Sequence, residues 1–360
     1  MKKHHFYLAL LLYSAISLFL AISTPISPHE AKQYYADNIV SWLMHIGEMI
    51  YPGFLGLRLF SLLSAALSVS LFYILSKRHF KNRSDAYFAT TIFMFLPGIL
   101  TATAMANIGI LVLPLVLLFV LLYEEGNRWA LPFIMLALFF LHEASILFFL
   151  ALLLYAIVRQ EKILGIFAAT FIIASLYLSK GIAIGGRPSG HFIEIFGLYA
   201  AVFSPLLFLY FFYTMYRKLL REEGSLMWYI SFTALAVSLL LSLRQKVYIT
   251  DFAPYVMIAT IEMVELFMQS LRVRLPQFQT NYRRGFYFVI LVLILSILPV
   301  IFNRTFYLMT KDRTKQFAGR IYHPYFLAEE LKSKGIECYD AKEKERRQLR
   351  YYGITPCSKP

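Results

Sequence analysis

The stretch Ile26-Ser-Pro-His-Glu-Ala-Lys-Gln-Tyr-Tyr35 follows the first long apolar segment of the chain and precedes the second. It contains His29, Glu30 and Lys32, although only 16% of the residues in the whole chain are Asp, Glu, Lys or Arg. A soluble globular domain is usually about one quarter charged. The stretch is therefore expected to be a polar loop between membrane segments, and this contrast decides the fold class.

Apolar segments recur along most of the chain, which is 59% hydrophobic with a mean hydropathy of +0.61. Segments of about 17 to 25 residues are long enough to cross a bilayer as helices, whereas barrel strands are about 10 residues of alternating polarity. The sequence therefore predicts an all-α polytopic membrane protein with about eleven transmembrane helices. The expected spans are Phe6–Ser23, Phe54–Ser76, Ala86–Leu100, Ile108–Tyr123, Trp129–Leu141, Ser145–Val158, Ile163–Ser179, Leu198–Tyr216, Ser225–Leu243, Pro254–Ser270 and Phe286–Phe302.

Basic residues are unevenly divided between the two sets of loops. Sixteen lie at the N-terminus or in one set of loops, and six lie in the other set. The positive-inside rule places the richer side in the cytoplasm, so we expect a multi-pass inner-membrane protein with a cytoplasmic N-terminus and an extracytoplasmic C-terminus. A weak cleavage pattern at Ala21-Ile22-Ser23 leaves a signal peptide as the alternative for the first span. The net charge of +14 follows membrane topology, so we expect no nucleic-acid partner.

The chain divides into a transmembrane domain, residues 1–302, and a small extracytoplasmic domain, residues 303–360. The first outer loop is expected at about residues 24–53. In the tail, His323–Lys334 is predicted to be a helix, and Gly335–Tyr339 and Arg350–Ile354 are predicted strands, so the tail should be α/β. Its two cysteines, Cys338 and Cys357, are either paired or free.

Glu30 and His29 are the candidate catalytic residues of the first outer loop. A carboxylate there is able to deprotonate an acceptor hydroxyl or to bind a divalent cation such as Mg²⁺ or Mn²⁺ beside a lipid phosphate. The alternative is that Glu30 only stabilises the N-terminus of a helix, where an acidic side chain is favourable.

Further polar residues are expected on the outer side. His142 and Glu143 interrupt a strongly apolar stretch, which is typical of a cavity lining but also of a tight turn. Arg187 lies in another outer loop. Arg244 and Lys246 suit a lipid phosphate, because arginine binds it bidentately and lysine acts as a point charge, but interfacial anchoring explains them equally well.

Several segments, taken in order, resemble glycosyltransferases of the GT-C class, in particular the protein mannosyltransferase and aminoarabinose transferase group. The first is His29-Glu-Ala-Lys-Gln-Tyr34, which resembles an Asp-Glu-Ala-x-Tyr motif in the first outer loop of that class. Tyr51-Pro-Gly-Phe-Leu-Gly-Leu-Arg-Leu-Phe-Ser61 and Arg244-Gln-Lys-Val-Tyr-Ile-Thr-Asp-Phe-Ala-Pro254 resemble two later segments. Ala328–Gly335 and Leu349–Ile354 resemble the small end domain of bacterial members.

The resemblance implies a membrane enzyme that moves a sugar from a polyprenyl-phosphate donor to a lipid, glycan or protein acceptor. It implies that Glu30 is the base or metal ligand, and that Arg244, Lys246 and Tyr248 border the donor phosphate. His142, Glu143 and Arg187 join them as substrate-binding candidates. Two departures stand out, because His29 and Asn107 occupy positions where the class has acidic residues. A non-catalytic subunit of the same fold and a lipid or solute transporter are the alternative functions.

Overall fold

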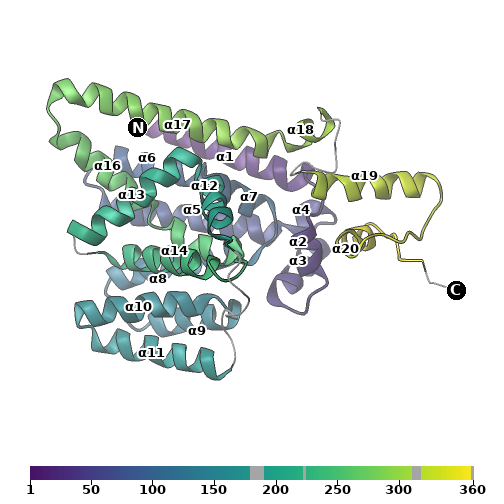
Figure 1. The fold of residues 1–360 in the computed structure, drawn as a ribbon, viewed down its shortest axis with the longest axis horizontal. Helices are drawn as coiled ribbons and strands as arrows, with labels where there is room; N and C mark the ends of the chain where they lie inside the picture. Colours follow the sequence, from purple (N-terminus) through teal and green to yellow (C-terminus); the bar gives the residue numbers. More distant parts are fainter. Residues whose placement is uncertain (179–189, 222–223, 310–317, 358–360) are drawn as a thin grey trace. The chain divides into compact units, whose positions relative to one another are not determined.

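A computed structural model describes residues 1–178, 190–221, 224–309 and 318–357 of the chain (Figure 1). These ranges form helices, and their only β interaction is an isolated parallel bridge between Cys338 and Thr355. The helices belong to two compact units. Unit 1 comprises Met1–Leu12, Ser64–Ile99 and Ile108–Ser296, and unit 2 comprises Tyr13–Leu63, Leu100–Asn107 and Ile297–Pro360.

Unit 1 is built from apolar helices that pack side by side. Figure 1 shows α8, α10, α11 and α14 as near neighbours, and α15 packs against both α8 and α14. The bounds are α6 Arg83–Met94, α8 Ile108–Glu124, α9 Leu131–Leu141, α10 Ser145–Arg159, α11 Lys162–Tyr177, α12 Phe192–Phe203, α13 Pro205–Arg221, α14 Leu226–Ser242, α15 Ile249–Met257 and α16 Thr260–Val273.

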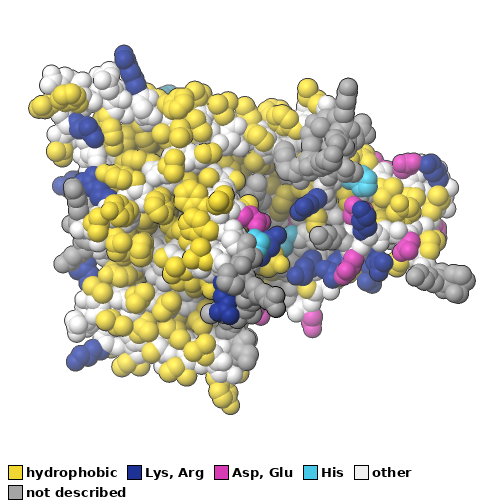
Figure 2. Space-filling view, in the orientation of Figure 1, with side chains coloured by type: hydrophobic (Ala, Val, Ile, Leu, Met, Phe, Trp, Pro, Cys, Tyr) yellow, Lys and Arg dark blue, Asp and Glu magenta, His cyan; other side chains and the backbone are white. Residues whose placement is uncertain are grey.

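Unit 1 exposes many large hydrophobic side chains. Over α10, α13 and α14, hydrophobic side chains dominate the face seen in Figure 2. Trp129 is 89% exposed and Phe133 is 74% exposed in the protein alone. Soluble monomers rarely expose large contiguous apolar patches, whereas a helix in a bilayer has no reason to hide them. The surface therefore agrees with the predicted membrane location.

Two predicted spans are broken by proline. Ala86–Leu100 is divided into α6 and α7 (Pro97–Ala104), and Leu198–Tyr216 is divided into α12 and α13. Pro205 begins α13, and the preceding Ser204 has a φ of 86°, so the two helices meet at 106°. Proline lacks a backbone N–H and disfavours helical geometry in the residue before it.

The predicted count of about eleven spans is not confirmed. Among the described residues, three helices are long and apolar enough to cross a membrane, α1 (Lys3–Ser23), α5 (Leu59–His79) and α17 (Pro276–Ile301). The number rises to five if each bent pair forms one span. The remaining apolar helices are shorter, because turns and prolines end them early; Pro254–Ser270, for example, is divided between α15 and α16.

Unit 2 contains the region expected to be an outer loop, and most of that region is helical. α2 (Pro28–Tyr34) and α3 (Ile39–Ile50) pack together, followed by the short α4 (Phe54–Leu57). That residues 24–53 connect two spans on the outer side stays a prediction, and the structure adds that most of this connection is helical. Its sequence carried the signal: Ser27-Pro-His-Glu30 is a capping box, in which Ser27 and Glu30 each accept a hydrogen bond from the other's backbone N–H.

The tail contributes α18 (Asn303–Met309), α19 (Gly319–Ser333) and α20 (Glu343–Tyr351) to unit 2. The helix expected at His323–Lys334 is confirmed as part of α19. The strand expected at Arg350–Ile354 is wrong, because Leu349 and Gln348 are buried on one face of α20 while the arginines beside them are exposed. Gly335–Tyr339 keeps only the single bridge, so an α/β tail is not confirmed. Cys338 and Cys357 form a disulfide.

Candidate functional site

Glu30 forms a fully buried ion pair with Arg58 in unit 2. Both side chains are 0% exposed. The guanidinium donates two hydrogen bonds to the carboxylate, from Nε to Oε1 at 2.7 Å and from Nη2 to Oε2 at 2.9 Å. Arg58 also donates to the carbonyl oxygens of Ala21, Thr24 and Pro25, at 2.9, 2.7 and 3.1 Å. The pair therefore joins the end of α1, the turn after it and the start of α2 to the start of α5.

The backbone supplies two further donors to the same carboxylate. The N–H of Ser27 donates to Oε2 at 2.9 Å, and the N–H of Ala106 donates to Oε1 at 2.8 Å. Each oxygen of Glu30 thus accepts two hydrogen bonds, which fills the roughly four acceptor positions of a carboxylate. Burial by itself would raise the pKa of Glu30, but the charge of Arg58 and these hydrogen bonds outweigh it and lower the pKa.

This geometry bears directly on the predicted catalytic role. A general base needs a lone pair within reach of the proton that it accepts, and both oxygens of Glu30 are engaged by protein donors. Base catalysis by Glu30 stays a prediction, and it requires the pair with Arg58 to open. His29, beside it on α2, is exposed.

The proposed metal ligand stays a prediction too. In the described part of the chain, no three His, Cys, Asp or Glu side chains are grouped so that they could hold a metal ion.

The helix that carries Glu30 is fixed by the C-terminal tail. Gln348 of α20 donates to the carbonyl oxygen of Ile26 at 2.8 Å, and the hydroxyl of Tyr352 accepts from the N–H of Ile26 at 3.1 Å. Glu48 of α3 accepts hydrogen bonds of 2.7 Å from both Tyr34 and Tyr351. These contacts were missed from the sequence, because nothing local marks a glutamate on α3 and a tail over 300 residues away as neighbours.

In unit 1, His142 pairs with Asp251. His142 ends α9 and Asp251 lies in the first turn of α15, with 3.4 Å between Nε2 and Oδ1. The His142 side chain is only 9% exposed, and its Nδ1 is buried without a hydrogen-bond partner. The carboxylate orients the imidazole, but the unpaired Nδ1 is itself buried, so proton transfer to it would require the surrounding side chains to move, as it would for Glu30. Sequence reasoning missed Asp251, because nothing local marks it as the partner of His142.

The other predicted substrate-binding residues of unit 1 are more exposed. Lys246 pairs with Glu194 of α12 at 3.7 Å, with side chains 63% and 45% exposed. Glu194 also contacts His191, at 3.0 Å. Exposed pairs of this kind contribute only about 0–1 kcal/mol, so Lys246 can exchange Glu194 for another anion at little cost.

Arg244 and Tyr248 are exposed on the segment between α14 and α15, and Glu143 is exposed beside His142. Arg187 lies outside the described residues. In unit 1 the structure therefore brings His142 to Asp251 and Lys246 to Glu194, pairs that link α15 and the segment before it to α9 and α12.

The fold matches known protein structures, whereas the sequence matches no known family. No protein-family model and no curated protein sequence matches the chain. Two crystal structures of ArnT from Cupriavidus metallidurans do match it. The apo structure has a TM-score of 0.56 and 13% identity, covering 96% of this chain and 74% of ArnT. The structure bound to undecaprenyl phosphate has a TM-score of 0.57 and 12% identity, covering 98% of this chain and 75% of ArnT.

The chain has a GT-C-like membrane glycosyltransferase fold. The resemblance suggested by its ordered sequence segments is confirmed at the level of the fold. At 12% and 13% identity, the likeness to ArnT assigns no role to any single residue.

Proposed function

We propose that the protein is a membrane glycosyltransferase that moves a sugar from a polyprenyl-phosphate donor to a lipid, glycan or protein acceptor at the outer face of the inner membrane. The observation that carries this proposal is the likeness of fold to ArnT over nearly the whole chain. The second ArnT structure holds undecaprenyl phosphate, which supports a donor of that lipid class.

The donor phosphate is the leaving group, so cations beside it stabilise the charge that develops as the sugar departs. We assign this role to Arg244 and Lys246, with Arg187 and Tyr248 as further contacts. The exposed pair of Lys246 with Glu194 supports the assignment, because a weakly held ammonium group is available to the donor phosphate, whose negative charge increases as the sugar leaves.

The acceptor hydroxyl needs a base, for which the chain offers two candidates. Glu30 is the predicted one, with or without a divalent cation, but its four hydrogen bonds hold it in place. His142 has an unpaired ring nitrogen and an orienting carboxylate. Glu30→Gln separates them: a catalytic Glu30 predicts lost transfer with normal stability, whereas a structural Glu30 predicts that stability and transfer fall together.

The test uses the full chain in nanodiscs with a panel of polyprenyl-phosphate sugars and measures release of polyprenyl phosphate. Arg244→Gln/Lys246→Gln should slow release at least about tenfold, because each lost charge-assisted contact is worth roughly that factor. The matched control, Arg283→Gln/Arg284→Gln, removes the same charge from the side predicted to be cytoplasmic and should change little. Equal losses in the two variants would contradict the assignment.

A non-catalytic subunit of the same fold is the second candidate. The saturated carboxylate of Glu30 and the exposed His29 in place of an acidic residue favour it. Failure of the native chain to release polyprenyl phosphate from any donor in the panel, while still binding the lipid, would support this function over the enzyme. A lipid or solute transporter stays a prediction, which transport by the same protein in liposomes would test.

A further inference from the structure

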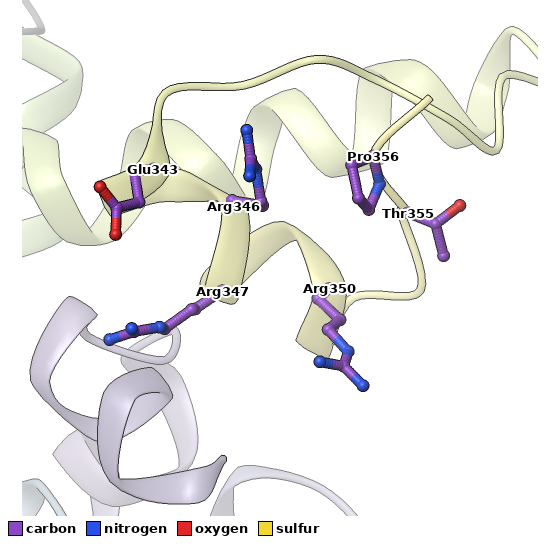
Figure 3. A pocket seen from close by; sticks show the side chains of 6 residues that line it. All are labelled: Glu343, Arg346, Arg347, Arg350, Thr355 and Pro356. Atoms are coloured by element: carbon purple, nitrogen blue, oxygen red, sulfur yellow. The ribbon is translucent and has the colours of Figure 1, made fainter. Parts of the chain in front are cut away.

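The exposed face of α20 carries a row of arginines. Glu343, Arg346, Arg347 and Arg350 are spaced i, i+3, i+4 and i+7, so they share one side of the helix. The opposite side, with Leu349, packs into the small core of the tail. Figure 3 shows the four side chains along the helix, with Thr355 and Pro356 beside its C-terminal end.

These six residues line a hollow of roughly 500 Å³. That volume falls within the range of small-molecule sites, about 300–1,000 Å³, and is ample for a phosphate group together with part of the molecule that carries it. The lining contains three guanidinium groups and one carboxylate, which leaves a net charge of two positive units.

Thr355 and Pro356 form one wall of the hollow, and the fold holds this wall in place. Gly353, with a φ of 85°, reverses the chain after α20 and brings Thr355 back alongside. The N–H of Thr355 donates to the carbonyl of Glu337 at 3.0 Å, and the N–H of Tyr339 donates to the carbonyl of Thr355 at 2.9 Å. The Cys338–Cys357 disulfide closes this arrangement. The wall is therefore held from both ends.

The arginines are not arranged as an ordinary solvated helix surface. Arg346 and Arg350 are four residues apart, and like charges at that spacing repel and destabilise a helix. Arg346 forms an exposed ion pair with Asp340 at 3.7 Å, with side chains 49% and 68% exposed, and such pairs are weak. Arg350 instead stacks on the ring of Tyr35 at 4.6 Å, which orients the guanidinium while leaving its N–H groups free to bind. An anion bound beside either arginine would reduce the repulsion.

We propose that the arginine face of α20 is a binding site for a phosphate-bearing ligand, carried as a phosphomonoester or diphosphate. Arginine pairs with phosphate through two parallel N–H···O bonds, which lysine cannot form. The exposed lysines of the same tail, Lys332, Lys334 and Lys342, lie outside the hollow. The site does not depend on the proposed transferase activity, because it is defined by charge and shape in the tail alone.

The experiment titrates the full chain, in nonionic detergent, with inorganic pyrophosphate and separately with a short-chain phosphatidic acid. Short-chain phosphatidylcholine is the uncharged control. Calorimetry should detect binding of a phosphate ligand that weakens with added salt, because screening acts on exposed charges. Binding of pyrophosphate would show that the phosphate suffices, and binding of phosphatidic acid alone would show that a lipid carrier is required. Failure of both to bind would overturn the proposal.

Two variants localise the binding. Arg346→Gln/Arg347→Gln/Arg350→Gln should lower the affinity at least about tenfold, the effect of losing one charge-assisted contact or more. Lys332→Gln/Lys334→Gln/Lys342→Gln removes the same charge outside the hollow and should leave the affinity within about twofold. Equal losses of affinity in the two variants would show that only the net charge of the tail matters, which would contradict a specific site.

Removing the disulfide beside the wall tests the site without changing the arginines. Cys338→Ser/Cys357→Ser should weaken phosphate binding while leaving all three arginines in the chain. Unchanged affinity in this variant, with the tail still folded by circular dichroism, would contradict the part of the proposal that gives Thr355 and Pro356 a role.

Discussion

Replacing Arg58 by methionine should be among the most damaging single changes in this protein. The substitution leaves the carboxylate of Glu30 fully buried with no counter-charge, and it removes five hydrogen bonds that Arg58 donates. Removing one partner of a buried ion pair typically costs about 3–5 kcal/mol. Total stabilities are only about 5–15 kcal/mol, so Arg58→Met should lose about a fifth or more of the free energy of unfolding.

A double variant tests whether the cost comes from the stranded charge. In Arg58→Met/Glu30→Gln the charge is gone, and the amide oxygen of the glutamine still accepts from the N–H of Ala106 or Ser27. We expect this variant to be more stable than Arg58→Met by about 1–3 kcal/mol, the range of coupling between contacting residues. The measurement is the free energy of unfolding in mixed micelles, followed by circular dichroism. A loss below about 1 kcal/mol in Arg58→Met, or no recovery in the double variant, would refute the reasoning.

Three further predictions concern ionisable side chains of the two units: one pH dependence, one loss of stability and one loss of activity. The pKa of Glu30 in the folded protein is lower than its ordinary value of 4.5. The ionised carboxylate therefore stabilises the protein fully above pH 4.5, and this stabilisation is lost as the pH falls through the pKa of the folded state. The difference in unfolding free energy between native protein and Glu30→Gln should shrink on acidification. Lys218→Met should cost about 3–5 kcal/mol, because Lys218 lies 3.3 Å from the 1%-exposed Glu262, and thermal unfolding measures the loss. His142→Gln should slow sugar transfer about 100-fold or more if its free nitrogen accepts the acceptor proton, as polyprenyl phosphate release would report.

Each of these has a matched control. A pH-independent difference between native protein and Glu30→Gln would show that the carboxylate is not held ionised by its partners. Lys218→Arg keeps the charge beside Glu262 and should retain most of the stability, so an equal loss would point to packing instead. His79→Gln removes another histidine that pairs with a carboxylate, Glu124 at 3.0 Å, from the side predicted to be cytoplasmic, and it should leave transfer nearly unchanged. Full activity in His142→Gln would exclude His142 as the base.

Local sequence determined the helices and their chemical character. Long apolar segments with few charges have one stable form in lipid, a helix that satisfies its own backbone, and most expected spans appear as helices close to their predicted bounds. The start of α2 is also determined locally, because the Ser27–Glu30 capping box is complete within four residues. The helix N-terminus that the sequence allowed at Glu30 is therefore confirmed, while the outer location of this connection stays a prediction.

Tertiary structure alone decided what Glu30 and the tail do. The partners of Glu30 are Arg58, 28 residues away, and the backbone of Ala106, 76 residues away, and no periodicity in the sequence reports either distance. The same holds for His142 and Asp251, and for the hollow on α20, where Thr355 returns beside the arginines next to the Cys338–Cys357 disulfide. The sequence could show which groups are polar among apolar neighbours. Only folding could show which of them are already satisfied, because that depends on donors brought from distant parts of the chain.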